Sequence, residues 1–228
     1  MLADRVRTGS ITEKVDTSLI LHCKDSSNYD NLISEIYNGY TVFNTWKDYS
    51  GNNNHMIQPI QPKMGAPTTL GQSLDTSQFM YSTFGMSELT GNKPRTIIIE
   101  IFIQAQGNIF GYGVGTEGAM VDGYVTGLKF GIHAYGTGFD NISIAPTITL
   151  NQMIVLTLRY DGTRVVTSNG NIHSSPLVMA LNTGTSPFYI NKGIYQPLDG
   201  AVRGVYKNLK IYNRYLSDAE LATVISSL

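Results

Sequence analysis

The sequence predicts an all-β protein, an antiparallel β-sandwich that ends in a short C-terminal helix. Three observations lead to this fold class. The chain of 228 residues is 42% hydrophobic and 14% charged, and it contains 23 glycines; this composition suits half-buried strands joined by tight turns. Several runs alternate apolar and polar residues, which is the period of a strand. Asp-Gly and Asn-Gly dipeptides separate some of these runs, and such dipeptides favour hairpins.

The strongest strand signal lies at residues 96–103. Every second residue from Ile97 to Ile103 is isoleucine, whereas Glu100 interrupts the alternate positions. Because alternate side chains of a strand point to opposite faces, the isoleucine face is expected in the core and the Glu100 face is expected to be the wetter one. Further strands are predicted at residues 19–23, 41–43, 128–132, 154–160 and 163–167.

Turn-forming residues separate these strands. The dipeptides Asp161-Gly162 and Asn169-Gly170 suit two-residue hairpin turns, so the strands around them are expected to form an antiparallel meander. Residues 50–54, which read Ser-Gly-Asn-Asn-Asn, tolerate left-handed backbone and predict a loop. The glycine-rich segment 111–115 is also predicted to be a turn, because it lacks the following helix that phosphate binding requires.

Two segments predict helix. Within residues 29–37 the apolar spacing favours one or two helical turns. Near the C-terminus, Ser217 and Glu220 form a capping box, and Leu216 and Leu221 form the hydrophobic staple that accompanies it. A helix is therefore expected to begin at Ser217 and to lie against the sandwich, because its apolar residues share one stripe. The stripe consists of Leu221, Val224, Ile225 and Leu228.

The first residues of the chain differ from the rest. Sandwiches of this length commonly form one domain, so we expect a single domain over residues 18–228. Residues 1–17 are polar and lack a periodic apolar face, which predicts an N-terminal arm or a strand exchanged with a neighbouring subunit. Residues 1–7 resemble no signal peptide, and the single cysteine, Cys23, is expected to be a buried thiol. We therefore expect synthesis in a reducing cytoplasm.

Charge and hydropathy exclude two classes of partner. The formal net charge is -1, and no cluster of Lys and Arg with interleaved aromatic residues occurs, so nucleic acid is not an expected partner. The chain also lacks an apolar stretch of about 18 residues, so no membrane insertion is expected.

Four segments, in this order, resemble the laminin-G-like jelly rolls of the concanavalin A-like superfamily. Residues 48–55 look like the family's Asp-x-Ser-Gly-Asn turn, and residues 71–75 resemble its Gly-x-x-Leu strand entry. Residues 153–170 are similar to its central hairpin, although Met153 replaces the usual Trp. Residues 200–220 resemble its closing strand and helix cap, but Lys207 and Asn208 replace the acidic or amide residues of many relatives. The resemblance implies the fold and says little about function.

The same superfamily contains glycoside hydrolases, whose retaining mechanism needs two carboxylates about 5–5.5 Å apart. No Glu-x-Glu or Glu-x-Asp-x-x-Glu spacing occurs in the sequence. Glu100 is the one acid inside a long predicted strand, and it is better explained as a strand-end or paired carboxylate. The four histidines show no zinc-binding spacing. We expect a protein that is not an enzyme.

A candidate ligand site lies between residues 110 and 141. Aromatic side chains stack on the apolar face of a sugar ring, while Asp and Asn accept or donate directional hydrogen bonds to its hydroxyls. The alternative is that the aromatic residues fill the core and the polar ones make turns. The candidates are Tyr112, Asp122, Tyr124, Tyr135, Phe139, Asp140 and Asn141.

Calcium is the one cofactor that the resemblance suggests, because some laminin-G-like domains hold Ca²⁺ in rim loops. The oxygen donors nominated for such an ion are Asp122, Asp140 and Asn141. Calcium needs six to eight oxygen ligands, and one sequence does not show whether these positions converge. The metal therefore stays unassigned.

The sequence thus predicts a non-catalytic, lectin-like module that binds a cell-surface glycan. Its layout, a polar arm before a sandwich without disulfides, is similar to that of phage virion or tail appendage proteins. That similarity implies a place on the surface of a virion or particle, contacts with other particle subunits and a homo-oligomer. Two alternatives remain open, a purely structural decoration or connector protein and a glycoside hydrolase.

Overall fold

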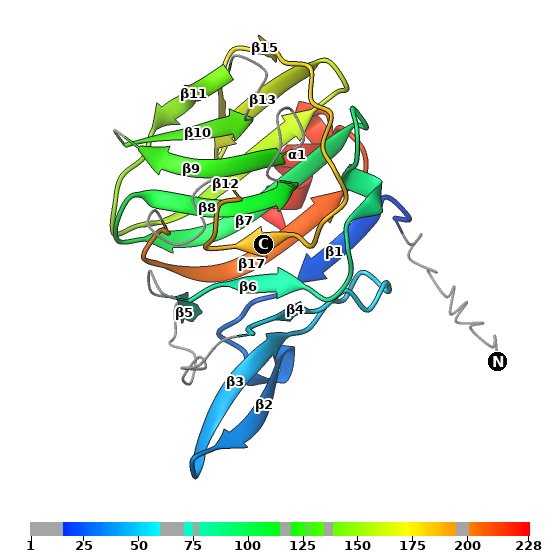
Figure 1. The fold of residues 1–228 in the computed structure, drawn as a ribbon. Coiled ribbons are helices and arrows are strands. Elements are labelled where there is room, and N and C mark those ends of the chain that lie inside the picture. The colour runs from blue at the N-terminus through cyan, green and yellow to red at the C-terminus, as the bar shows by residue number, and fades with distance from the viewer. Residues whose placement is uncertain are drawn as a thin grey trace, which may run out of the picture.

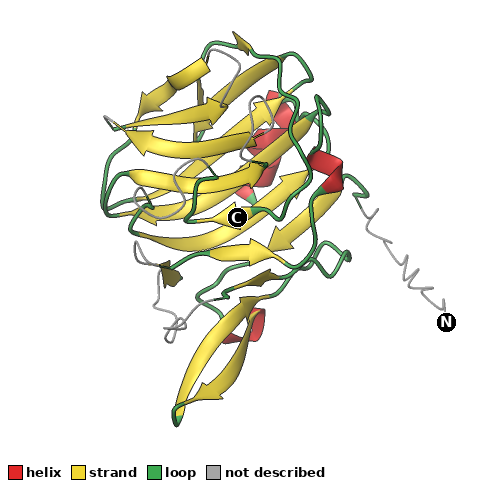
Figure 2. Cartoon of the chain, viewed as in Figure 1, coloured by secondary structure: helices red, strands yellow, loops and turns green. Residues whose placement is uncertain are grey.

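The computed structural model describes residues 16–59, 71–74, 78–114, 120–126, 128–134, 139–194 and 201–228. In this part of the chain two β-sheets stack face to face, and the paired strands run antiparallel. Figures 1 and 2 show the two layers, with one helix packed behind the first sheet. The predicted antiparallel β-sandwich with a short C-terminal helix is confirmed.

The first sheet contains eight of the described strands. Its order is β1 (Leu19–Cys23), β17 (Gly204–Tyr212), β7 (Arg95–Ile103), β12 (Met153–Tyr160), β13 (Arg164–Asn169) and β14 (Ile172–His173), while β5 (Gln72–Leu74) pairs with β17 and β15 (Leu177–Val178) pairs with β13.

The second sheet contains nine of the described strands. Its order is β11 (Phe139–Thr147), β10 (Lys129–Ala134), β9 (Met120–Thr126), β8 (Gly107–Gly113), β16 (Tyr189–Ile190), β6 (Met80–Ser82), β4 (Met56–Ile57), β3 (Tyr40–Trp46) and β2 (Leu32–Tyr37). Two 3₁₀ turns, η1 (Tyr29–Asn31) and η2 (Ser87–Leu89), lie in the connections.

The core lies between the sheets, where inward-facing side chains interdigitate. The isoleucines at alternate positions from Ile97 to Ile103 are at most 1% exposed, as their spacing predicts. The other face of β7 is more buried than expected at Ile98, which is also 1% exposed. It packs in a second cluster with Leu216 and Leu221, so the C-terminal helix covers a face that the sequence alone left open to water.

The C-terminal helix α1 (Asp218–Ser226) begins where the sequence predicts. Ser217 and Glu220 form both halves of the capping box, and Leu221 is 1% exposed. Figure 1 shows the helix lying along the back of the first sheet. The helix is therefore part of the packing of the sandwich, as its apolar stripe indicates.

Two local predictions are wrong. Residues 29–37 form a single 3₁₀ turn followed by strand β2, because Asn38 and Gly39 take positive φ angles of 50° and 80° and close a tight hairpin with β3. The glycine-rich segment predicted as a turn lies in β8 up to Gly113. A Cβ on Gly111 would lie 2.9 Å from the Lys192 carbonyl oxygen, so glycine is needed there to let another segment cross the strand.

Candidate functional site

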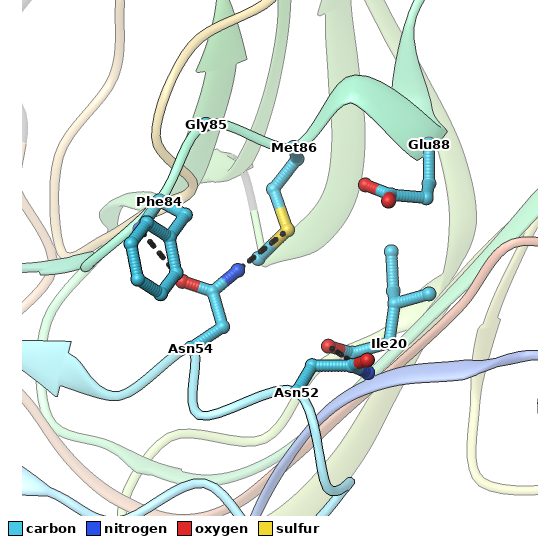
Figure 3. A pocket seen from close by; sticks show the side chains of 7 residues that line it. All are labelled: Ile20, Asn52, Asn54, Phe84, Gly85, Met86 and Glu88. Carbon is cyan, nitrogen blue, oxygen red and sulfur yellow. Dashed lines mark hydrogen bonds between the residues drawn. The ribbon is translucent and has the colours of Figure 1, made fainter.

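A hollow of about 220 Å³ opens where three distant parts of the chain meet. One wall comes from β1, one from the turn after β3 and one from the segment between β6 and η2 (Figure 3). The residues that line it are Ile20, Asn52, Asn54, Phe84, Gly85, Met86 and Glu88.

The Asp48 carboxylate orders the turn that forms one wall. Its Oδ1 accepts hydrogen bonds from the backbone N–H groups of His22, at 2.9 Å, and Ser50, at 2.8 Å. Its Oδ2 accepts from the Ser50 hydroxyl at 2.8 Å and from the Asn54 N–H at 2.9 Å. Gly51 has a φ of 94°, which suits the left-handed backbone predicted for this loop. One buried acid therefore ties β1 to both ends of the turn.

The Asn54 side chain connects this turn to the opposite wall of the hollow. Its Oδ1 accepts a hydrogen bond from the Phe84 N–H at 2.8 Å, and its Nδ2 donates to Met86 Sδ at 3.4 Å. Asn54 is 6% exposed, whereas the Phe84 side chain is 57% exposed. The backbone of Phe84 is thus held in place while its ring stays open to solvent at the side of the hollow (Figure 3).

Two polar groups face the same space. Asn52 donates its Nδ2 to the carbonyl oxygens of Leu19 and Ile20 at 3.3 and 3.2 Å, which orients its amide. Glu88 lies on η2 and is exposed. Within the described ranges, neither the Asn52 Oδ1 nor the Glu88 carboxylate has a hydrogen-bond or ion-pair partner. Figure 3 shows the Glu88 carboxylate above the hollow, so both groups are available as acceptors.

This arrangement can bind a small polar ring. An aromatic face attracts the apolar C–H face of a sugar, and carbonyl and carboxylate oxygens accept hydrogen bonds from hydroxyl groups. Phe84 supplies the aromatic face, and Asn52 and Glu88 supply the acceptors. Glu88 is the one acid among the described residues that line the hollow, so this lining does not contain the two carboxylates that a retaining glycosidase needs.

A histidine beneath the turn is held neutral. Burial lowers the pKa of His22 to about 4, and the positive charges of Lys210 and Lys24 add to this effect while Asp48 opposes it. At neutral pH the imidazole of His22 is therefore uncharged. The wall of the hollow depends on the His22 backbone N–H and not on a charged ring.

Tyr112, one of the predicted ligand residues, lies in the core. It is 1% exposed, its ring stacks on Phe110 and Phe188, and its hydroxyl accepts a hydrogen bond from Arg95 at 3.2 Å. Burial raises the pKa of this hydroxyl. The ring offers no face to a sugar, which matches the alternative that these aromatic residues fill the core.

Asp122 and Tyr124 lie on β9 and are also buried, at 2% and 8% exposed. Asp122 Oδ1 accepts a hydrogen bond from the Ile194 N–H at 2.7 Å, so its carboxylate holds the 191–194 segment against the sheet. The Tyr124 hydroxyl is buried without a hydrogen-bond partner among the described residues, and burial raises its pKa. Both residues thus lie on β9, and neither lines the hollow.

Phe139, Asp140 and Asn141 lie at the start of β11, and Tyr135 lies outside the described residues. β11 is separated from β9 by one strand, β10, so Asp140 and Asn141 are near Asp122 in strand order. The described residues contain no group of three or more His, Cys, Asp or Glu side chains suited to a metal. A ligand role for residues 139–141, and a calcium ion, stay predictions.

Glu100, the acid considered for hydrolysis, has close partners. Its carboxylate accepts a hydrogen bond from the Asn208 side-chain amide and lies 3.6 Å from Lys207 Nζ. Both partners sit at the irregular register of β17 opposite β7. This environment fits the paired carboxylate that the sequence predicts.

Sequence reasoning did not single out Phe84 or Glu88. The available signal was indirect: a large aromatic residue in the mostly polar or small segment 82–88, which reads Ser-Thr-Phe-Gly-Met-Ser-Glu and has no strand periodicity that would bury the ring. Asn52 was assigned to a loop, which is correct, but its neighbours across the hollow are about 30 positions distant in the chain. The three residues meet through tertiary structure.

Comparisons with known proteins find similarity in structure alone. No family model matches the sequence, and no curated protein matches it. A Trypanosoma rangeli sialidase with a covalently bound 2,3-difluorosialic acid is similar over 92% of this chain, with a TM-score of 0.64 and 13% identity. A second structure of that sialidase, in complex with sialic acid, has a TM-score of 0.61 and 14% identity over 92% of this chain.

The binding domain of botulinum neurotoxin serotype D is also similar, with a TM-score of 0.59 and 11% identity over 93% of this chain. The chain spans 33% of the length of both sialidase chains and 52% of the toxin domain. At this identity the likeness establishes the fold alone, a β-sandwich. No helix in the described part of the chain is long and apolar enough to cross a membrane.

Proposed function

We propose that this protein is a non-catalytic module that binds a glycan in the hollow beside Phe84. One observation carries the proposal: the Phe84 ring, which is 57% exposed, lies beside two acceptors, Asn52 Oδ1 and the Glu88 carboxylate, that have no partner among the described residues. A large apolar side chain normally leaves water, whereas exposed aromatic residues next to polar groups are typical of binding sites.

The structural neighbours support this proposal at the level of fold. One similar structure is a sialidase in complex with sialic acid, and another is a toxin binding domain. Because the chain spans 33% of the sialidase, the likeness by itself does not carry the enzyme's activity to this chain. Recognition without cleavage agrees with the hollow, whose lining contains one acid, Glu88.

A glycan array with matched variants tests the proposal. In Phe84→Ala, loss of the stacking face should weaken binding about tenfold, which corresponds to about 1.4 kcal/mol. Tyr29→Ala is the control, because Tyr29 is 55% exposed but does not line the hollow. Glu88→Gln should reduce binding less, since an amide oxygen still accepts hydrogen bonds. Equal binding by both alanine variants, or no glycan bound at all, refutes the proposal.

A structural role in a particle is the second candidate, and one observation favours it. The β2–β3 hairpin projects from the sandwich (Figure 1), and Ile36 and Tyr40 on it are 72% and 75% exposed. Such residues suit a contact with another subunit. If the array shows no binding while the double variant Ile36→Ser/Tyr40→Ser prevents assembly, the structural role replaces the glycan-binding role.

A place on a phage virion or tail, and a homo-oligomeric state, are further parts of the proposal. Their support is the polar composition of residues 1–17, which precede the sandwich. Light scattering of the full chain and of a chain that lacks residues 1–17 tests the oligomer: a fall in the number of subunits on truncation supports an assembly arm, and an equal number of subunits refutes it. A hydrolase would instead release reducing sugar and lose this activity in Glu100→Gln.

A further inference from the structure

A second group of aromatic side chains lies on the outer face of the second sheet. Tyr81 on β6 and Tyr189 on β16 are directly opposite each other in the register, and their ring centres are 6.1 Å apart at 44°. Their chain neighbours Met80 and Ile190 are buried in the core. Because side chains alternate along a strand, both tyrosines point outward, and both are partly exposed.

Lys192 places its ammonium group over this cluster. Its Nζ lies 4.5 Å from the ring centre of Phe79 and 4.6 Å from that of Tyr189. Cations are attracted to the faces of aromatic rings at these distances. The ammonium thus contacts the rings of Phe79 and Tyr189. Tyr81 packs against Tyr189.

The backbone on both sides of Lys192 is anchored. The Asn191 N–H donates to the Ile109 carbonyl at 2.7 Å, and its side-chain amide donates to the Gln78 carbonyl at 2.8 Å. On the other side, the Ile194 N–H donates to Asp122 at 2.7 Å. The position of Lys192 is therefore set before any ligand arrives, which reduces the entropy lost on binding.

Among the residues that the structure describes, the ammonium has no anionic partner. Within the described ranges no carboxylate or carbonyl oxygen accepts a hydrogen bond from Lys192 Nζ, whose contacts are the two rings. Burial lowers the pKa of Lys192, as expected for a cation that is partly removed from water without compensation. The Asp122 carboxylate binds the Ile194 N–H and is 2% exposed. The three N–H donors of the ammonium remain available to a ligand.

Phe79 is 7% exposed, so its ring supports Lys192 and is not itself open to a ligand. We propose that the face formed by Tyr81, Tyr189 and Lys192, here called the aromatic-lysine face, binds a sugar ring that carries a carboxylate. The apolar side of the ring would stack on the tyrosines, and the carboxylate would accept charge-assisted hydrogen bonds from Lys192 Nζ. This face shares no residue with the lining of the hollow. The inference therefore adds an acidic-sugar site to the proposed glycan-binding function and has its own test.

Titration of the full chain with three oligosaccharides tests the inference. Sialyllactose and a hexuronate oligosaccharide both carry a carboxylate and differ in the sugar that bears it, whereas lactose is neutral. We expect at least one acidic probe to bind at least tenfold more tightly than lactose. Which of the two binds identifies the source of the carboxylate. Binding should weaken as NaCl is raised, because an ion pair at the surface is screened by salt.

Two lysine variants separate this site from a general effect of charge. Lys192→Met keeps an apolar chain against the rings but removes the charge, so acidic probes should bind at least tenfold more weakly and lose their salt dependence. Lys24→Met is the matched control, because Lys24 Nζ likewise lies over an aromatic ring, 4.7 Å from the centre of Tyr49. Lys192→Arg keeps the cation and should retain binding.

The outcomes distinguish this inference from the proposed function. Acidic-probe binding that is lost in Lys192→Met but kept in Phe84→Ala and Lys24→Met supports the aromatic-lysine face. Binding that is lost in Phe84→Ala but kept in Lys192→Met places the acidic sugar in the hollow and overturns the inference alone. Absence of acidic-probe binding to the unmodified chain also overturns it, whether or not neutral glycans bind.

Discussion

Asp48 and Asn54 are joined across their turn by a hydrogen bond of 2.9 Å, in which the Asn54 backbone N–H donates to Asp48 Oδ2. Asn54 in turn accepts from the Phe84 N–H at 2.8 Å. One carboxylate that is 8% exposed therefore determines where the exposed ring at the hollow stands. Stability and binding are coupled through this pair, because the turn and the ring share one chain of hydrogen bonds.

Asp48→Asn is expected to lower the free energy of unfolding by about 2 kcal/mol, because the new amide places N–H donors where the Ser50 hydroxyl and the Asn54 N–H now donate. Glycan binding should weaken as the turn loosens. Urea unfolding measures the first effect, and Asp30→Asn is the control. Asp30 is exposed, so its substitution should change stability by less than about 0.5 kcal/mol. Equal stability of Asp48→Asn and the unmodified chain contradicts this prediction.

His22 is expected to make folding less stable in acid. Its pKa in the folded chain is about 4, below the ordinary value of 6.5. Between these two values the unfolded chain binds more protons than the folded chain, so stability falls as the pH is lowered through this window and rises with pH. The shift corresponds to about 2 kcal/mol after allowance for solvent screening of the partly exposed ring.

The variant His22→Gln isolates this contribution from the carboxylates that titrate in the same range. Urea unfolding of both chains at pH 7.5 and pH 4 gives the difference between them at each pH. We expect the variant to lose about 2 kcal/mol less than the unmodified chain on going to the lower pH. A loss of the same size in both chains means that His22 does not carry the acid sensitivity.

The features that the sequence predicted well are those set by neighbouring residues. Alternation in β7 and the Ser217 capping box depend on residues at most a few positions apart, and the structure has both. The apolar spacing of residues 29–37 fits a helical turn and predicts a helix there. The Asn38-Gly39 dipeptide that follows was the stronger signal, since it closes a hairpin and makes a strand of them.

The candidate site was less predictable because its parts are distant in sequence. Ile20, Asn52 and Phe84 meet at the hollow only after two sheets have stacked. Glycines near Tyr112 suggested loops that approach a ligand, but Gly111 instead admits the 191–194 segment over a strand. A single sequence shows which residues are suited to close approach, and it does not show what approaches them.

Gly123→Ala is expected to destabilise the fold by about 2 kcal/mol through overpacking. A Cβ at this position would clash with the Phe110 ring, which packs against both Tyr112 and Phe188. Thermal unfolding measures the effect. The double variant Gly123→Ala/Phe110→Leu should recover part of the loss relative to Phe110→Leu alone, because the smaller side chain leaves room. Additive losses in the double variant contradict the steric explanation.

Arg95 is the last test, because it is a fully buried cation held by neutral groups. It is 0% exposed. Its guanidinium donates to the Thr183 hydroxyl at 2.8 Å and to the Gly91 carbonyl at 2.7 Å, and it lies 5.1 Å from the ring centre of Tyr160. Arg95→Met removes donors from several buried acceptors and should cost about 3–5 kcal/mol.

Arg95→Lys keeps the charge but replaces the planar group by a point charge that reaches fewer of these acceptors, so we expect a loss of at least about 2 kcal/mol. Urea unfolding of the two variants provides the comparison. Retention of full stability in Arg95→Lys means that charge alone suffices and that the geometry of the guanidinium is not required. A smaller loss in Arg95→Met than in Arg95→Lys means that burying the cation is itself the larger cost, as holds for some buried ion pairs.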